Sequence, residues 1–307
     1  MGDASTMSAL PPAPTVTGEP STPSPRALLV RRMLRHKGFL VGLALMALLG
    51  LAAAFAPAIA GHDPFDQDLA HRLMPPAWSQ GGSWAHLFGT DHLGRDYLAR
   101  LLYGARISLA IGLGAATVGC LIGVTLGVCA GYFGGRVDQA VSYLLTCHLA
   151  LPGLLFAMAL VFLIGPSLGV VILVIGSLHW TYYLVVTRAA TMQLKRLDFV
   201  AAAEAIGESR WQVIVHELLP NLLNPILVIF TLEIGVAVLA EAALSFLGVG
   251  VRPPAPSWGL MIAEGKDAMF FRPWLVVLPG AALFLLVMAA NLLGDGLRDV
   301  TAPQGRN

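Results

Sequence analysis

Two carboxylates lie within one long apolar stretch of this 307-residue chain, and their spacing places them on one helical face. Glu233 and Glu241 are eight residues apart in 222–246, a segment without any other charged residue. An ionisable group inside a membrane span is costly and usually faces a cavity or a partner. Both are therefore candidate pathway residues that meet a cationic group of a substrate. The alternative is a hydrogen bond between helices or a protonated carboxyl between subunits.

Two histidines, His148 and His179, lie in the two apolar stretches before the one that carries the carboxylates. Imidazole is a good ligand for nickel and copper. Two histidines on different helices do not make a ligand set, however, and buried histidines often bond to carbonyl groups. We keep His179 as a third candidate pathway residue and predict no bound metal. The nearby Trp180, Tyr182 and Tyr183 are expected to pack or anchor rather than to bind substrate.

Signals for catalysis are absent from the sequence. It contains no G-x-x-x-x-G-K-[ST] loop that would cradle the phosphates of ATP, and no nucleophile–base pair or metal motif. Cys120, Cys129 and Cys147 all lie in apolar runs and show neither a disulfide framework nor zinc spacing. We predict a non-catalytic chain that binds no cofactor of its own.

The elements that position these residues are expected to be membrane spans. The chain is 56% hydrophobic and 12% charged, whereas ordinary soluble domains are roughly 45–50% apolar and about 25% charged. The net charge of +1 suggests no nucleic-acid partner. A bilayer crossing needs about 20 mainly apolar residues. Six stretches qualify and predict an all-α polytopic membrane protein: 39–60, 107–130, 140–164, 168–187, 222–246 and 274–293.

The distribution of basic residues predicts the orientation of these spans. With a cytoplasmic N-terminus, twelve of the nineteen Lys and Arg residues fall on the cytoplasmic side, as the positive-inside rule requires. Five of the twelve precede the first span. Both termini are then cytoplasmic, and the segments 61–105 and 248–273 face outward. A helix-like pattern after Gly94 is expected to lie along the outer interface before the second span begins.

Three regions follow from these patterns. Residues 1–25 are rich in Pro, Ser, Thr and Ala and predict a disordered tail. Residues 26–105 form an N-terminal region with an amphipathic helix around 26–37, the first span and the outward segment. Residues 106–303 form a core with the other five spans. The first apolar run exceeds the length of a signal-peptide core, so we expect a retained span.

A charged, helix-patterned insert separates the fourth and fifth spans. Asp198 is expected to cap a short alanine-rich helix, and Gly207 to end it in a left-handed conformation. Ser209 and Gln212 fit a capping box that opens a second helix, and Pro220 marks the start of the next element. Such a helix–turn–helix with small side chains is a candidate docking surface; a solvated loop without a partner is the alternative.

The insert resembles the cytoplasmic coupling loop of binding-protein-dependent ABC importer permeases, written E-A-A-x-x-x-G-x9-I-x-L-P. The positions that match are Ala202, Ala203, Gly207, Leu219 and Pro220. Two positions depart from the motif, because Ala201 replaces its Glu and Glu217 replaces its Ile. Glu204 or Glu208 is a candidate to supply the polar contact that Ala201 lacks.

Five further stretches are similar to the second permease of the dipeptide, oligopeptide and nickel importers. They are 89–96, 131–135, 240–248, 253–259 and 291–299. The resemblance covers about 26–303 and implies an ABC importer permease of type I in the cell inner membrane. It also implies a second homologous permease, one or two cytoplasmic ATPases that carry ATP and magnesium, and an extracytoplasmic substrate-binding protein.

The resemblance leaves the substrate open. Import of short peptides is the main interpretation, and import of nickel or a nickel chelate by the same architecture is the alternative. Glu233 and Glu241 also motivate a proton-coupled secondary transporter, but neither an inverted repeat nor a pair of broken helices is evident. An intramembrane enzyme has no supporting motif.

Overall fold

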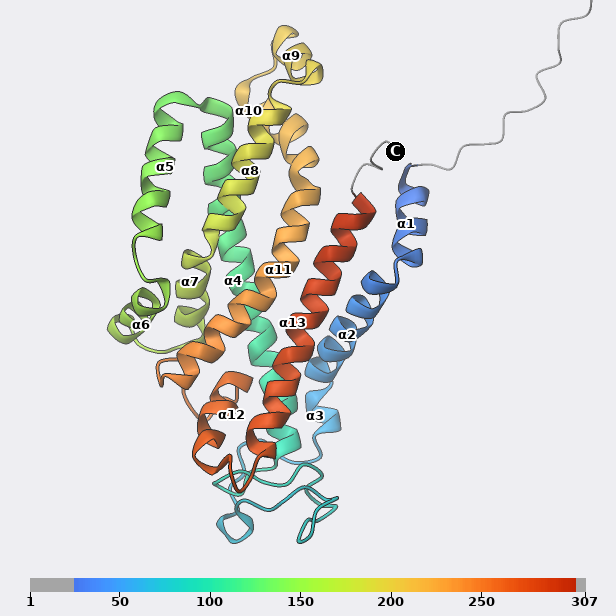
Figure 1. The fold of residues 1–307 in the computed structure, drawn as a ribbon, viewed down its shortest axis with the longest axis vertical. Coiled ribbons are helices and arrows are strands. Elements are labelled where there is room, and N and C mark those ends of the chain that lie inside the picture. Colours follow the sequence, from blue (N-terminus) through green and yellow to red (C-terminus); the bar gives the residue numbers. More distant parts are fainter. Residues whose placement is uncertain (1–24, 302–307) are drawn as a thin grey trace, which may run out of the picture.

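A computed structural model describes residues 25–301, and within this range the regular elements are helices, without a β-strand (Figure 1). The predicted tail at 1–25 lies almost entirely outside the described residues. The helices before the long central helix are α1 (Pro25–Arg35), α2 (Lys37–Ala54), α3 (Ala56–Ile59) and the short 3₁₀ turn η1 (Leu69–His71). The amphipathic helix predicted around 26–37 is therefore present as α1.

Within the described residues, five helices are long and apolar enough to cross a membrane, and a bent pair can form a sixth span. The five are 37–54, 97–133, 168–194, 210–246 and 274–301. In the same order they contain α2; α4 (Tyr97–Phe133); α7 (Leu168–Leu178) with α8 (Trp180–Leu194); α10 (Arg210–Gln212) with α11 (Leu219–Phe246); and α13 (Trp274–Thr301). The all-α polytopic architecture is confirmed.

The predicted span 140–164 is not one continuous helix. It consists of α5 (Gly135–Leu149) and α6 (Gly153–Ile164), which meet at 86°. Pro152 lies in the break between them. A proline lacks the backbone N–H for the helical ladder, and it disfavours helical geometry in the residue before it. The apolar composition alone concealed this break.

The helix expected along the outer interface is instead the first part of α4. Asp96 caps α4 by accepting the Ala99 N–H, and the helix then continues through 37 residues, about 55 Å at 1.5 Å per residue. Since the hydrocarbon core is roughly 30 Å thick, α4 tilts or extends beyond it. Arg95 and Arg100 are buried, so this part of the chain packs its charged side chains inside the protein.

Glycines let α4 pack closely along α8. A Cβ added at Gly123 would overlap the Trp180 carbonyl oxygen, and one at Gly127 would overlap the Thr187 hydroxyl. Small residues at this spacing allow helix backbones to approach. On its other sides α4 contacts α2, α7 and α11, so it is the central helix of the bundle.

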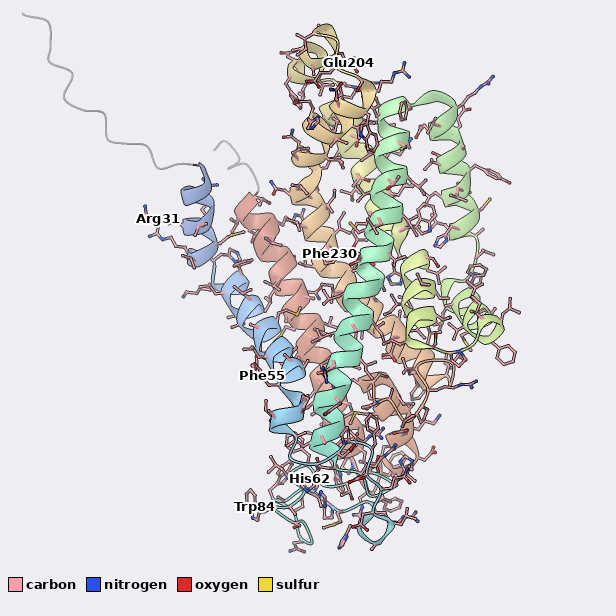
Figure 2. All side chains as sticks on the ribbon, turned by 180° about the vertical axis from the view of Figure 1, so that it is seen from behind. Arg31, Phe55, His62, Trp84, Glu204 and Phe230 are labelled. Carbon is pink, nitrogen blue, oxygen red and sulfur yellow. The ribbon has the colours of Figure 1, made fainter. Side chains whose placement is uncertain are left out.

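The two ends of the bundle are clearly distinguished (Figure 1). The start of α1, the end of α13 and the short helix α9 (Asp198–Ala205) lie at one end. The loops of 61–96 and α12 (Trp258–Gly265) lie at the other, with the 3₁₀ turn η3 (Lys266–Ala268) directly after α12. Figure 2 shows Glu204 at the first end, and His62 and Trp84 at the second. We call these the α9 end and the α12 end.

Candidate functional site

The predicted insert forms a helix–turn–helix at the α9 end. Leu197 rather than Asp198 is the N-cap of α9, and no side chain caps this end. The prediction for Asp198 was wrong because the chain enters the helix one residue earlier, which makes Asp198 its first helical residue. Its carboxylate still lies at the positive end of the helix dipole.

The turn after α9 has the expected left-handed glycine. Gly207 has φ of +90°. Its N–H donates to the Glu204 carbonyl, and the Glu208 N–H donates to the Ala203 carbonyl, both at 3.1 Å. This pair of bonds is the Schellman motif, in which the residue after the cap adopts positive φ. The predicted capping box is also present, because Ser209 and Gln212 exchange side-chain to backbone hydrogen bonds.

The second helix of the insert continues without interruption into the fifth span. After α10, residues 213–218 form a π-helical segment, and α11 follows directly. Pro220 was predicted to start a new element, but it lies in the first turn of α11, inside the continuous helix 210–246. In the wider π-helical register, the Leu219 N–H donates to the Ile214 carbonyl. The next residue, Pro220, has no backbone N–H to donate. The insert is thus rigidly joined to a membrane span.

The predicted coupling residues fall on two sides of this insert. Of these residues only Ala203 is buried, and together with its neighbour Val200 it packs in a cluster that includes Val128 of α4 and Val213 of the π segment. The remaining predicted coupling residues are exposed or half-buried: Ala201, Ala202, Glu204, Gly207, Glu208, Leu219 and Pro220. Two large apolar side chains, Ile206 and Trp211, are also exposed at 79% and 72%. Sequence reasoning had not selected them as docking residues.

Glu204 and Glu208 both line an open pocket at the α9 end. The Tyr132 hydroxyl of α4 donates to Glu204 Oε1 at 3.0 Å. Lys195 donates to the Tyr132 carbonyl at 2.7 Å. The pocket has a volume of about 430 Å³, and its lining residues are Tyr132, Phe133, Lys195, Glu204, Glu208 and Arg210. Glu204 therefore ties α9 to α4.

His179 and Glu233, two of the candidate pathway residues, are paired. His179 Nδ1 donates to Glu233 Oε2 at 2.9 Å, between the α7–α8 junction and α11. Glu233 is only 4% exposed. A cavity of about 190 Å³ adjoins His179 and also reaches His148 and Leu244. The sequence identified both partners, but their 54-residue separation hid the contact.

Glu241 has a different environment from Glu233. Its Oε1 accepts hydrogen bonds from the Ser245 and Ser257 hydroxyls at 2.6 and 2.8 Å. The residue is fully buried and ties α11 to the start of α12. This geometry favours the alternative of a bond between helices. The half-buried His148 likewise donates to the Leu178 carbonyl at 3.1 Å, which agrees with the expected bond to a carbonyl group.

A buried ion network at the α12 end was missed by sequence reasoning. Arg95 Nε donates to Asp91 Oδ2 at 2.6 Å, and Arg100 Nη2 donates to Glu264 Oε2 at 2.7 Å. Arg95 also approaches Glu264, and Arg100 also approaches Asp91, each at 3.4 Å. The network joins the segment before α4 to α12. Asp91 and Arg95 both lie in the stretch 89–96, which resembles the permease family. That resemblance did not indicate an ion pair.

Comparisons with known proteins agree with this architecture. Residues 123–306 match the family model described as binding-protein-dependent transport system inner membrane component. Residues 24–76 match the N-terminal TM domain of oligopeptide transport permease C. Among solved structures, the MetNI methionine ABC transporter in an inward-facing conformation is similar with a TM-score of 0.52 and 20% identity. That match covers 66% of this chain and 96% of the other, and it bears on the fold alone.

Curated relatives extend over nearly the whole chain. The di/tripeptide transport system permease protein DppC of Pseudomonas aeruginosa is 40% identical, over 98% of this chain and 99% of its own length. The dipeptide transport system permease protein DppC of Haemophilus influenzae is 39% identical, over 88% and 92%. The glutathione transport system permease protein GsiD of Pectobacterium atrosepticum is 37% identical, over 89% of both chains.

Proposed function

The chain belongs to the family of binding-protein-dependent transport system inner membrane components, and we propose that it is the permease subunit of an ABC importer for short peptides. The observation that carries the proposal is the alignment with a di/tripeptide permease over 99% of that relative's length. The helix–turn–helix joined to a span supports it, because such an element can transmit motion from a cytoplasmic motor. The names of these relatives do not favour nickel as the substrate.

The proposed assembly contains partners that supply what this chain lacks. A second homologous permease completes the pathway, and an extracytoplasmic binding protein delivers the peptide. One or two cytoplasmic ATPases dock on the insert and carry the ATP and magnesium. ATP binding then shifts the population of the whole assembly between conformations, and the rigid insert passes the change to the spans.

The proposed orientation places the α9 end in the cytoplasm. The described ends of the chain lie at the α9 end (Figure 1), and the basic residues before the first span favour the cytoplasm. The α12 end then faces outward in the inner membrane. Ile206 and Trp211, exposed beside the small residues of α9, extend the proposed ATPase contact beyond the motif.

The function is tested by reconstitution of the complete importer in proteoliposomes. Dipeptide uptake is expected to require ATP and the binding protein, and to continue after the proton gradient is collapsed. Uptake driven by the gradient alone would support the secondary-transporter alternative and overturn the proposal. Nickel uptake without peptide uptake would overturn only the choice of substrate.

Within this function, Glu233 is proposed to meet the cationic end of a peptide in transit. The Glu233→Gln variant is expected to lower dipeptide uptake by roughly tenfold or more, since a hydrogen bond to a charged group contributes about 1.5–3 kcal/mol. Uptake per assembled complex and ATP hydrolysis are both measured, and hydrolysis is expected to persist.

Glu241→Gln is the matched control on the same helix. Because Glu241 is held by two serines, we expect this variant to change the melting temperature rather than the uptake per complex. Wild-type uptake by the Glu233→Gln complex would show that the pair with His179 is only structural.

A further inference from the structure

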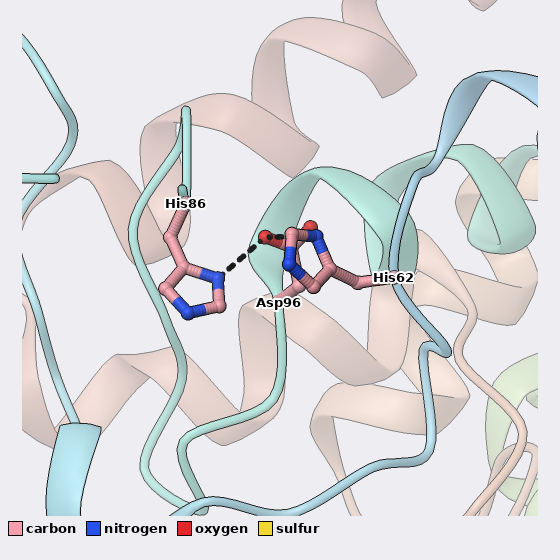
Figure 3. A group of neighbouring side chains, drawn as sticks. All are labelled: His62, His86 and Asp96. Atoms are coloured by element: carbon pink, nitrogen blue, oxygen red, sulfur yellow. Dashed lines mark hydrogen bonds and ion pairs between the residues drawn. The ribbon is translucent and has the colours of Figure 1, made fainter. Parts of the chain in front are cut away.

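Three potential metal ligands meet at the α12 end, although sequence analysis predicted no bound metal. His62 follows α3, His86 lies in the outward loop, and Asp96 caps α4 (Figure 3). His86 Nδ1 lies 2.9 Å from Asp96 Oδ2, and His62 Nδ1 lies 3.8 Å from the same oxygen. The two imidazole rings are 4.9 Å apart between centroids. Three separate segments thus direct ligand atoms to one point.

These distances suit a small divalent transition metal. Zinc binds histidine nitrogen at about 2.0–2.1 Å and carboxylate oxygen at about 2.0–2.2 Å, in a tetrahedron. Two ligands of such a tetrahedron are about 3.3 Å apart. The observed separations of 2.9 and 3.8 Å lie on either side of this value. A small movement of the His62 side chain, which is 45% exposed, brings all three ligands into range.

The shell around Asp96 keeps its carboxylate in place. Asp96 Oδ1 accepts the Ala99 N–H at 2.7 Å, while Oδ2 faces the histidines. Such outer hydrogen bonds orient metal ligands. The guanidinium of the neighbouring Arg95 is held by Asp91 and Glu264, which leaves the Asp96 charge available to a cation.

The other histidine–carboxylate group at this end is less suitable. Asp91, His92 and Glu264 also lie within ligand distance of one another. Both of its acids are already paired with Arg95 and Arg100, so a cation there would have to compete with two arginines.

We propose that His62, His86 and Asp96 bind one zinc ion, with a fourth position open to solvent or to a partner. The ion ties the segment after α3 and the loop around His86 to the start of α4. It therefore stiffens 61–96, a large part of the surface that faces outward in the proposed orientation. Zinc binding requires neither ATP nor transport, so its test is independent of the proposed function.

The test is zinc binding to the full-length, tag-free chain purified in detergent, measured by calorimetry and by metal content after dialysis. We expect one zinc per chain. His62→Ala and His86→Ala are each expected to weaken binding by at least about tenfold, as the loss of one ligand from a three-ligand site requires. X-ray absorption of the bound zinc is expected to show two imidazole ligands.

Two control variants separate ligation from folding. Asp96→Asn keeps a good helix cap but removes the anionic ligand, so it is expected to bind zinc weakly while retaining the wild-type melting temperature. His71→Ala removes an exposed histidine whose hydrogen bond lowers the pKa of the Asp68 carboxyl, and it is expected to bind zinc normally. Equal affinity in the wild type and in the two alanine ligand variants would overturn the proposal.

Hydrogen exchange gives a second readout. Zinc is expected to slow amide exchange in 61–96 of the wild type and not of His62→Ala. Calcium and magnesium are expected to have no such effect, because they prefer oxygen ligands. The absence of any zinc-dependent protection, or equal protection by calcium, would show that the cluster holds no zinc and that His86 only hydrogen-bonds the capping carboxylate.

Discussion

Replacing Asp91 by alanine is expected to destabilise the α12 end by about 3–5 kcal/mol, the usual cost of removing one partner from a buried ion pair. Asp91 accepts hydrogen bonds from the Arg95 side chain at 2.6 Å and from the Leu93 and Arg95 backbone N–H groups. Arg95 is 2% exposed and Arg100 is fully buried. Without Asp91, two desolvated guanidinium groups would share Glu264 alone.

The measurement is thermal unfolding of the purified chain in detergent, together with its amount in the membrane. Asp63→Ala is a matched control, because Asp63 is an exposed acid of the same outward segment and accepts only a local backbone bond from Phe65. A double variant that also replaces Arg95 by methionine is expected to recover part of the loss, since one uncompensated charge is then removed. A melting temperature equal to that of Asp63→Ala would show that the network contributes little.

The membrane spans and the insert were predictable because their signals are local. About 20 consecutive apolar residues indicate a membrane span. Two residues three positions apart, such as Ser209 and Gln212, indicate a capping box. The left-handed turn at Gly207 is equally local, since glycine adopts positive φ without a steric cost. Even so, the break at 150–152, which contains Pro152, was missed, because hydropathy reports the length of an apolar run and not the continuity of the helix.

The side-chain contacts of the candidate sites were not predictable, since they join residues that are distant in the chain. Arg100 and its partner Glu264 are 164 residues apart, so nothing near Arg100 in the sequence indicated the bond between them. The pairing of His179 with Glu233 is of the same kind. A single sequence shows the chemical type of each side chain but not which distant side chain lies beside it in the fold. From sequence alone, a charged residue near the start of a helix is expected to be exposed to solvent. Arg100, in the first turns of α4, is fully buried instead.

Replacing Gly207 by valine is expected to abolish peptide uptake while the chain remains in the membrane. Positive φ costs a residue with a Cβ about 1–2 kcal/mol, and more for a β-branched side chain. The strain falls on the Schellman turn that aligns α9 with the continuous helix 210–246. No atom lies within 4 Å of a Cβ added at Gly207, so the expected effect comes from backbone strain and not from a clash within the turn.

The valine variant is assayed by dipeptide uptake in proteoliposomes and by co-purification of the ATPases. Gly61→Val is the matched control: Gly61 also has positive φ, at +69°, with open space around its Cα, but it lies at the α12 end. We expect it to retain uptake and ATPase binding. Retention of both by Gly207→Val would show that docking does not depend on this turn.

Aspartate and asparagine at Gly207 separate backbone strain from charge. Both residues tolerate positive φ better than other side chains, and they have nearly the same shape. Asparagine is therefore expected to retain most uptake. Aspartate adds a third carboxylate close to Glu204 and Glu208, and that charge must be desolvated wherever a partner covers the turn. We expect Gly207→Asp to lose uptake and ATPase co-purification by roughly tenfold or more, which corresponds to about 1.4 kcal/mol. Equal uptake by the two variants would mean that no partner covers the turn, and would place the ATPase contact elsewhere at the α9 end.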